Sequence, residues 1–299
     1  MRIAIGIPTY NRDEVLLNTI EQAIKQSRPA DEIIVIDQTK NHTDEVKEKL
    51  DEWILSGKIF YKFQEQPSLP AARNFALSIT QCEVIIFIDD DIELPNDFVK
   101  QHEKNFVNDP LIQAVAGGVD QLLGWPNKKR PSSWPHALDY CYFYLGGKKR
   151  VENIASFAGG NHCIRVETAI KLGGYDERIK GVALREESDM AMRIYANGGK
   201  IVFDPDARLL HLAAPTGGCR KKNPLDIQAA RSNLFFVIKH ISVIRSHFFY
   251  EFWFSLRLGV FNKKNVKNPI YLILGSLKFL YVLVEIPVLL LFGKTTKQF

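Results

Sequence analysis

The sequence predicts an α/β fold in which a mostly parallel sheet is flanked by helices. Short apolar runs alternate with helix-length segments in the N-terminal third of the chain, an alternation typical of βαβ units. Three runs end in a polar or acidic tip: MRIAIGIPTYNR (1–12), IIVID (33–37) and VIIFIDDD (84–91). Ligands of open α/β sheets bind outside the carboxyl ends of the strands, so these tips predict a binding edge.

The expected elements follow in a regular order. Strands are predicted at 3–7, 33–36, 59–63 and 84–88, and helices at 13–26, 43–56 and 70–80. Pro95 suits the first turn of a helix and predicts a further helix to about Val107. Residues 112–119 then have the pattern of another strand, which ends in two glycines.

Residues 121–156 interrupt this order. They contain three prolines, two tryptophans and the basic run 128–130, and they predict a long irregular insertion. Regular structure is expected to resume at FAGGNHCIR (157–165). The remaining predictions are helices at 166–172 and 184–197 and two strands, IVFDP (201–205) and LLHL (209–212).

Composition is that of a globular protein, with 46% hydrophobic and 24% charged residues. The four cysteines form no CxxC pair, which favours reduced thiols in a cytosolic protein and gives no support for a zinc site. The chain enters a predicted strand at Ile3, so no cleavable signal peptide is expected.

The charge is distributed unevenly. Residues 231–299 carry ten Lys and Arg against two carboxylates, a net +8, whereas the preceding part carries a net −3. The same C-terminal segment holds 14 of the 33 aromatic residues. A basic segment that is also apolar favours an anionic membrane surface as partner, and not nucleic acid. The alternative is a helical layer with a solvated basic face.

Residues 269–293 are apolar and long enough to span a membrane. Lys278, Glu285 and Pro287 fall inside this segment, and a charge near the centre of a span costs about 2.5–3.5 kcal/mol. We therefore expect an interfacial or re-entrant helical pair, with a buried soluble helix second and a full span third. The predicted domains are a catalytic domain at 1–230, divided into two halves near residue 120, and a helical segment at 231–299.

Three consecutive carboxylates follow the strand at 84–88. Asp89, Asp90 and Asp91 would repel one another unless a cation or a proton compensates. Mg²⁺ or Mn²⁺ is the simplest explanation, because these hard cations prefer oxygen ligands and complete their coordination with substrate phosphates. The triplet predicts a metal-dependent enzyme that acts on a nucleotide diphosphate.

An ordered set of motifs supports a family resemblance. The set comprises PTYNR (8–12), VIDQ (35–38), PAARN (70–74), FIDDD (87–91), FAGGN (157–161), GGYDE (173–177) and REESDMAMR (185–193), with His211 after them. In this order they resemble the family 2 glycosyltransferases over roughly residues 1–240. The resemblance implies a GT-A fold and transfer of a sugar from a nucleotide-diphosphate sugar to an acceptor hydroxyl, usually with inversion.

The resemblance also implies roles for single residues. Donor binding is implied for Pro8, Thr9, Tyr10, Asn11, Arg12, Asp37, Arg73, Asn74, Asp89 and Asp90. Of these, Asp37 matches the residue that accepts a hydrogen bond from the nucleotide base. Asp91, Asp89 and His211 match the metal ligands. Helix capping at Asn11 and a turn at Asp37 are the structural alternatives.

On the acceptor side the resemblance implies Gly159, Gly160, Asn161 and Glu186. The attacking hydroxyl must lose its proton to a nearby group, and the family commonly uses the Asp of a Glu-Asp pair. Alignment through Arg193 places Glu187 at this position, a departure that leaves Asp189 as the alternative base. An acidic first helical turn is the structural alternative.

The basic, apolar C-terminal segment suggests a lipid-linked or cell-surface glycan as acceptor and a location on the cytoplasmic face of the membrane. A sugar nucleotidyltransferase would need a Gly-rich loop where this chain has PTYNR, and a dinucleotide-dependent oxidoreductase would need GxGxxG. A catalytically inactive nucleotide-sugar-binding or scaffold protein is the rival of another class.

Overall fold

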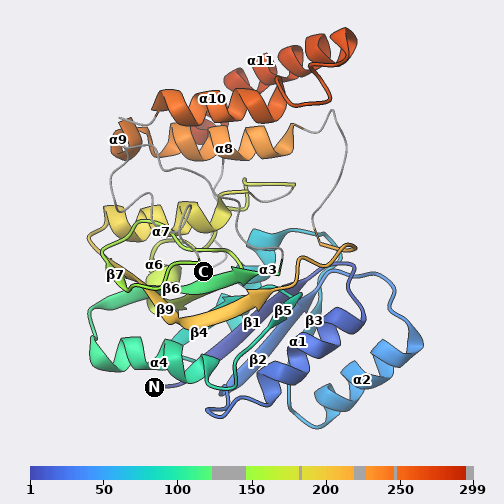
Figure 1. Ribbon diagram of the computed structural model, residues 1–299, viewed down its shortest axis with the longest axis vertical. Helices are drawn as coiled ribbons and strands as arrows, with labels where there is room; N and C mark the ends of the chain where they lie inside the picture. The colour runs from blue at the N-terminus through green and yellow to red at the C-terminus, as the bar shows by residue number, and fades with distance from the viewer. Residues whose placement is uncertain (123–145, 182–183, 219–226, 246–247, 294–299) are drawn as a thin grey trace.

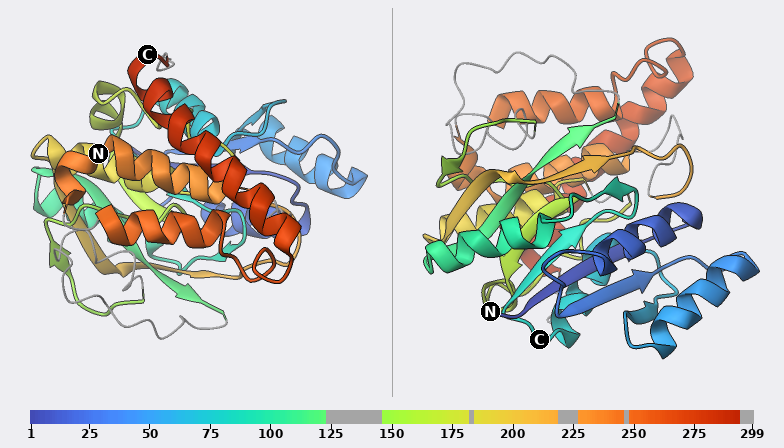
Figure 2. Two further views of the ribbon diagram at one scale, coloured as in Figure 1. Left: turned by 90° about the horizontal axis from the view of Figure 1, so that it is seen from above. Right: turned by 60° about the horizontal axis from the view of Figure 1, so that its bottom comes forward.

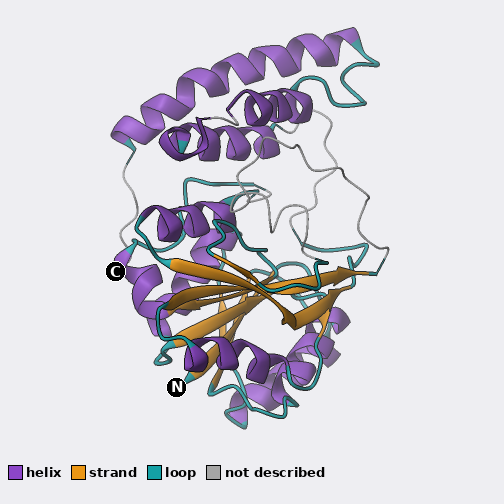
Figure 3. Cartoon of the chain, turned by 60° about the vertical axis from the view of Figure 1, so that its left-hand side comes forward, coloured by secondary structure: helices purple, strands orange, loops and turns teal. Residues whose placement is uncertain are grey.

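One mixed β-sheet lies at the centre of the computed structural model, which describes residues 1–122, 146–181, 184–218, 227–245 and 248–293 (Figure 1). Helices cover both faces of the sheet. A further layer of C-terminal helices lies beyond the helices of one face, at the top of the view (Figures 1 and 3).

The N-terminal part of the sheet is parallel. Its strands are β1 (Ile3–Thr9), β2 (Glu32–Asp37), β3 (Phe60–Phe63) and β4 (Val84–Ile88), in the order β3-β2-β1-β4. The helices between them are α1 (Glu14–Ile24), α2 (Asp44–Leu55) and α3 (Leu69–Ile79). These seven elements confirm the sequence predictions to within two residues at each end. The carboxyl ends of the four strands therefore meet at one edge of the sheet.

The rest of the sheet is mixed. It contains β5 (Ile92–Glu93), β6 (Ile112–Gln121), β7 (Val151–Glu152), β8 (Asn161–Arg165) and β9 (Lys200–His211). β8 runs antiparallel to both β4 and β6, and β6 is parallel to β9. Because β8 is reversed, its first residue, Asn161, pairs with Ile88, the last residue of β4. The FAGGN motif thus arrives at the same edge as the Asp triplet.

Two strand predictions differ from the structure. The runs IVFDP and LLHL belong to one strand, β9. The residues between the two runs are accommodated by a shift in the register of β9 against β6, between Gly117 and Val119. The two-residue strand β5 follows the Asp triplet directly and pairs with the end of β9, Ile92 against His211. So short a strand has no periodicity of its own and exists only through this pairing. Most of the predicted insertion, residues 123–145, lies outside the described residues.

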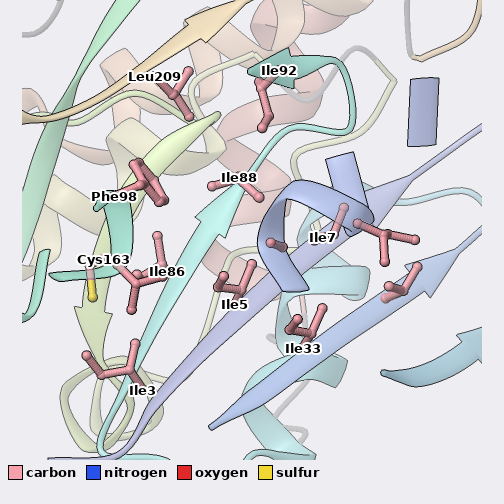
Figure 4. Packing of buried hydrophobic residues seen from close by; sticks show 14 of the residues in the cluster. Ile3, Ile5, Ile7, Ile33, Ile86, Ile88, Ile92, Phe98, Cys163 and Leu209 are labelled. Carbon is pink, nitrogen blue, oxygen red and sulfur yellow. The ribbon is translucent and has the colours of Figure 1, made fainter. Parts of the chain in front are cut away.

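The core divides between the two faces of the sheet. On one face Ile3, Ile5 and Ile7 of β1 pack with α1, α2 and α4 (Phe98–Asn108), as Figure 4 shows for the strands and Phe98. On the other face Ala4 belongs to a cluster with α3, α6 (Val166–Lys171) and α7 (Glu186–Ala196). Alternate residues of a strand point to opposite faces, so fully buried strands read as continuous apolar runs.

The C-terminal layer consists of α8 (Gln228–Lys239), α10 (Phe248–Gly259) and α11 (Pro269–Phe292), with the short α9 (Ile241–Ile244) between the first two. Seen from above, α8, α10 and α11 form the outermost layer of the molecule (Figure 2). Its own core includes Leu234, Phe235, Phe279, Val282 and Ile286. The same cluster includes Ile179, which precedes α7, so the layer packs on the rest of the chain and is not a detached tail.

The segment 269–293 forms a single helix, α11, and not the expected helical pair. Asn268 caps its start by accepting from the N–H groups of Ile270 and Tyr271, and Pro287 lies inside the helix without ending it. Within the described residues, α11 alone is long and apolar enough to cross a membrane, with a mean hydropathy of 2.0 in its most apolar window. Only 22% of that window is buried, which contradicts the alternative of a buried soluble helix.

Candidate active site

A cleft of about 270 Å³ opens at the carboxyl edge of the sheet. Its walls are Pro8, Thr9, Tyr10, Arg12, Gln38, Leu69, Asp89, Asp90, Asp91, His211 and Gly218. Eight of these residues are among those predicted for donor or metal binding. The structure therefore brings together the tip of β1, the Asp triplet and the end of β9, although β9 is distant in sequence.

Asp89, Asp91 and His211 form a group that could hold a cation, with one ligand atom from each lying within 4.8 Å of the others. The pairing of β5 with β9 sets His211 beside the triplet, with its Nε2 3.2 Å from Asp91 Oδ1. Nδ1 of His211 lies 3.1 Å from Gln121 Oε1, so the Nδ1–H tautomer would donate there and leave Nε2 for a metal. Two carboxylates and one imidazole fit a divalent ion such as Mn²⁺.

Asp90 is oriented differently from its neighbours. It accepts from Thr9 Oγ1 at 2.7 Å and lies 3.3 Å from Nε of Arg12. Burial raises the pKa of Asp90 to about 6, against the lowering effect of these two partners. Asp91 is also desolvated, but His211 and Arg12 outweigh the burial and hold its pKa below the usual value. Asp91 is thus more strongly ionised than Asp90.

Asp37 lies at the tip of β2, as predicted, with its carboxylate held by protein groups. Oδ2 contacts Nε2 of His42 at 2.7 Å and accepts from the Tyr61 hydroxyl at 3.2 Å, while Oδ1 accepts from the backbone of Thr39. The other ring nitrogen of His42 lies 2.7 Å from Asp13. Burial opposes protonation of His42, but the two carboxylates prevail and raise its pKa. Contact between Asp37 and a nucleotide base stays a prediction.

Arg73 and Asn74 lie in the middle of α3 and are buried. Arg73 donates to the carbonyl of Gly159 at 2.8 Å and forms an ion pair with Glu186. The amide of Asn74 bridges the backbone N–H and C=O of Tyr175. Neither residue lines the cleft described above, so their predicted contact with the donor stays untested.

The glycines of the FAGGN motif occupy the space between the Asp triplet and α7. A Cβ atom added to Gly160 would lie 2.2 Å from Asp89 Oδ2, and one added to Gly159 would lie 3.8 Å from Cγ of Glu187. Asn161 is buried: its Nδ2 donates to the carbonyls of Gly118 and Ala207, and its Oδ1 contacts His102. These contacts join β8 to β6 and β9, and a contact with acceptor stays a prediction.

The two candidate bases have opposite environments. Glu187 is half-buried, its carboxylate accepts from the Ser188 hydroxyl at 3.0 Å, and desolvation raises its pKa. Asp189 has no exposed surface and contacts Arg193, Lys239 and His240 at 2.6–2.9 Å. Burial alone would raise the pKa of Asp189, but the three basic partners hold it well below the usual value.

The model of the family described as glycosyl transferase family 2 matches residues 4–173, more than half of the chain. The chain belongs to glycosyl transferase family 2. The matched range contains β1, the Asp triplet and the FAGGN motif. The α7 cluster and His211 lie beyond it and are joined to it by the sheet.

Curated relatives of the chain include a probable glycosyltransferase and a rhamnosyltransferase of the O-antigen chain. The chain is 26% identical to the probable glycosyltransferase YdaM of Bacillus subtilis over 69% of its length, and it spans about half (49%) of that protein. It is 27% identical to the O-antigen chain rhamnosyltransferase RfbN of Salmonella typhimurium over 71% of its length, and 66% of RfbN is covered.

Solved structures share the GT-A fold. The mannosyltransferase PcManGT of Pyrobaculum calidifontis, in complex with GDP-Man and Mn²⁺, aligns with a TM-score of 0.57 at 18% identity, over 98% of this chain and 79% of that one. GalNAc-T7 with UDP, GalNAc and Mn²⁺ aligns with a TM-score of 0.61 at 20% identity, over 79% and 48%. At these identities the likeness shows the fold alone. The PcManGT alignment extends into the C-terminal layer, because it covers nearly all of this chain.

Two residues that contact predicted site residues were not found from the sequence, His42 beside Asp37 and Gln121 beside His211. His42 lies in a loop, five positions after Asp37 at the end of β2. The sequence around it shows no pattern that would distinguish it from an ordinary loop residue. Gln121 ends β6 and contacts His211, 90 positions away. Both belong to the site through pairing between strands and loops, which a local pattern does not record.

Proposed function

We propose that this protein is an inverting glycosyltransferase that moves a sugar from a nucleotide-diphosphate sugar to an acceptor hydroxyl. One observation carries the proposal: the Asp89–Asp91–His211 group and Glu187 lie on either side of the Gly159–Gly160 turn. A donor seated on the first group would present its anomeric carbon toward the second. Glycosyl transfer needs this pairing of a site for the leaving diphosphate with a base for the incoming hydroxyl.

Donor binding falls to the walls of the cleft. Thr9, Tyr10 and Arg12 of the loop after β1 lie beside the Asp triplet and are placed to contact the nucleoside and its phosphates. Asp91, Asp89 and His211 would hold Mg²⁺ or Mn²⁺, which supplies Lewis acid stabilisation to the leaving diphosphate when bound. The Mn²⁺ complexes of PcManGT and GalNAc-T7 support a divalent cofactor.

Glu187 is the proposed base. A raised pKa brings its proton affinity closer to that needed to take a proton from a hydroxyl near neutral pH. Asp189 is unsuited to this role, because three basic side chains share its carboxylate and stabilise the ionised form. Attack from the Glu187 side, opposite to the leaving diphosphate, would invert the configuration at the anomeric carbon.

The relatives and structural neighbours support a class of donor and acceptor. The neighbours bind UDP, GDP-Man or UDP-GlcNAc, and two relatives act in O-antigen biosynthesis by name. We therefore propose a nucleotide-diphosphate sugar as donor and a glycan as acceptor, either cell-surface or carried on a lipid. A role for nucleic acid finds no support.

The outer face of the C-terminal layer supports association with a membrane. Exposed apolar side chains along α11 include Ile270, Ile273, Leu277, Leu280, Tyr281, Val284, Val288, Leu291 and Phe292. Phe249 and Trp253 of α10 add exposed aromatic area. The opposite side of α11 packs on α8, so we propose that the helix lies in the interface. Basic residues at 263, 264 and 267 would favour the anionic, cytoplasmic face of that membrane.

A thermal-shift panel of UDP-, GDP- and dTDP-sugars, each with Mn²⁺ or with EDTA, tests the function. A specific donor should raise the melting temperature in Mn²⁺ only, because a ligand at a hundred times its Kd stabilises the folded state by about 2.7 kcal/mol. Release of nucleoside diphosphate from that donor would distinguish an enzyme from an inactive binding protein. No shift with any nucleotide, in either condition, would contradict the proposal.

A further inference from the structure

The first turn of α7, which carries Glu187, is tied to the C-terminal layer on both sides. We propose that the buried ion pair between Arg185 and Glu251 is a positioning device that holds Glu187 in place for proton transfer. The inference rests on the proposed function, because it takes Glu187 as the base. If so, α8 and α10 support the active site in addition to forming the layer proposed to face the membrane.

The backbone of Arg185 provides the first observation. Arg185 immediately precedes α7 and has φ 75° and ψ 6°, the left-handed conformation that disfavours residues with a Cβ atom. Its side chain makes no capping hydrogen bond to α7. A strained conformation of this kind persists only where surrounding contacts hold it. The contacts of the Arg185 side chain are therefore the place to look for what holds the turn.

Within the described residues, the hydrogen bonds and ion pair of the Arg185 side chain lead into the C-terminal layer. Nη2 of Arg185 lies 2.9 and 2.8 Å from the two carboxylate oxygens of Glu251 on α10, and Nε donates to Oδ1 of Asn233 on α8 at 2.8 Å. The guanidinium also lies over the ring of Phe236, 5.0 Å from its centroid. Arg185, Asn233 and Glu251 are all buried. The α7 turn is thus joined to two helices by one side chain.

The receiving site is itself fixed. Nδ2 of Asn233 donates to the backbone carbonyl of Glu251 at 3.2 Å and to the Ser255 hydroxyl at 3.0 Å, which joins α8 to α10 at the point where Arg185 enters. A buried network whose members satisfy one another is rigid, and removal of one charge leaves the other buried without a partner. Loss of the Glu251 charge should therefore leave the Arg185 guanidinium without its partner and let the first turn of α7 move.

A second anchor lies on the other side of Glu187. Asp189 is held by Lys239 and His240 at the C-terminal end of α8, at 2.6 and 2.8 Å. Glu187 is between Arg185 and Asp189 in sequence and faces Gly159. Its distance from the reacting hydroxyl therefore depends on α8 and α10. A displacement of about 1 Å in a reacting group can lower a rate by about a hundredfold.

The chain offers a matched control. Glu285 of α11 pairs with Arg231 of α8 at 2.7 Å, so it also joins two helices of the C-terminal layer. Within the described residues, neither Glu285 nor Arg231 forms a hydrogen bond or ion pair with α7. Glu251→Gln and Glu285→Gln each remove one charge from an inter-helix ion pair. The comparison between them separates positioning of Glu187 from general loosening of the layer.

The assay is hydrolysis of the sugar nucleotide that gives the largest thermal shift with Mn²⁺, with water in place of the acceptor. Glu251→Gln should lower kcat by about tenfold or more and leave the KM for the donor within about twofold, because the donor cleft is untouched. Glu285→Gln should leave kcat within about twofold of wild type. Arg185→Lys keeps the charge and loses the Nε bond, and it should give an intermediate kcat.

Amide hydrogen exchange gives a reading that does not depend on activity. Glu251→Gln should speed exchange in the first turn of α7, whereas Glu285→Gln should speed it in α11. Arg185→Lys serves the same comparison if Glu251→Gln does not fold. The proposal would be overturned if Arg185→Lys and Glu251→Gln both matched the Glu285→Gln control in kcat and in the exchange rate of α7. Wild-type turnover in Glu187→Gln would instead overturn the base assignment and leave the Arg185 contact purely structural.

Discussion

Two acidic clusters face the two sides of the Gly159–Gly160 turn, and they differ in what surrounds their charges. In the Asp89–Asp91 cluster, two carboxylates and His211 converge on one position beside an open cleft. In the Glu186–Asp189 cluster each carboxylate has its own environment: Arg73 for Glu186, a half-buried position for Glu187 and three basic side chains for Asp189. Two carboxylates and an imidazole that converge can share a cation, whereas the separate surroundings of the second cluster raise the pKa of Glu187 and lower that of Asp189.

The largest effect should come from the convergent cluster. Asp91→Ala removes a carboxylate ligand with a lowered pKa from the Asp89–Asp91–His211 group, and the affinity for UDP or GDP in Mn²⁺ should fall by roughly a hundredfold or more. Isothermal titration with and without EDTA measures the change. Asp44→Ala, at an exposed position on α2, is the matched control. Equal nucleotide affinity for the two variants would remove the metal from the proposed site.

Substitutions in the Glu186–Asp189 cluster should change the turnover of the enzyme and not its affinity for the donor. Glu187→Gln should lower kcat by about a hundredfold or more, the usual scale for loss of a general base, with the donor affinity unchanged. A general base must be deprotonated, so kcat should fall as the pH is lowered through the pKa of Glu187. Because desolvation raises this pKa, the fall should begin at a higher pH than for an ordinary glutamate. A pH profile of kcat measures both points. An acidic limb unchanged in Glu187→Gln would move the role to another residue.

Asp189 should matter for stability, since its carboxylate is shared by Arg193, Lys239 and His240. Asp189→Asn should lower the free energy of unfolding by about 3 kcal/mol near pH 7, the scale for breaking a buried ion pair. The folded-state pKa of Asp189 is lowered, so its contribution is present above the unfolded pKa of about 3.9 and is lost as pH falls below it. Urea unfolding at several pH values should therefore show the gap between the two proteins closing in acid. A constant gap would mean that lost packing, not lost charge, explains the variant.

The smallest effects are expected at the outer face of the C-terminal layer, whose inner side contributes Lys239 and His240 to the contacts of Asp189. Leu277→Ser and Val284→Ser should each weaken binding to anionic vesicles by about 1.5 kcal/mol or more, and the loss should persist in high salt. Substitution of Lys263, Lys264 or Lys267 by Gln should each remove about 1 kcal/mol, and only at low salt. Phe63→Ser, at an exposed position on β3 outside the C-terminal layer, is the control for sedimentation. Full solubility of the wild type with anionic vesicles at low salt would show that the layer has no membrane role.

Membrane tests are better made with such point variants than with a chain ending near residue 259. Phe279, Val282 and Ile286 of α11 belong to the core of the C-terminal layer, and Glu285 pairs with Arg231. Removal of α11 would uncover α8, which also holds Asp189. A truncated protein would therefore lose membrane contact and active-site support together.

The local sequence was enough to predict much of the fold and about half of the candidate site. Buried parallel strands are continuous apolar runs, so β1, β2 and β4 and their polar tips could be predicted from the sequence, and the ordered motifs identified the family. The Asp triplet needed no tertiary knowledge either, because three adjacent carboxylates after a buried strand already imply a compensating charge.

Only the tertiary structure showed that the carboxylates have different surroundings. The partners that distinguish Glu187 from Asp189 come from α8, some 50 positions further along the chain, and the strand pairing that brings His211 to Asp91 joins segments more than 100 residues apart. A pKa depends on the charges and the burial around a group, and these are set by packing between elements. The outer face of α11 was decided in the same way: its apolar residues are evident in the sequence, but which of them α8 covers is a property of the packed layer.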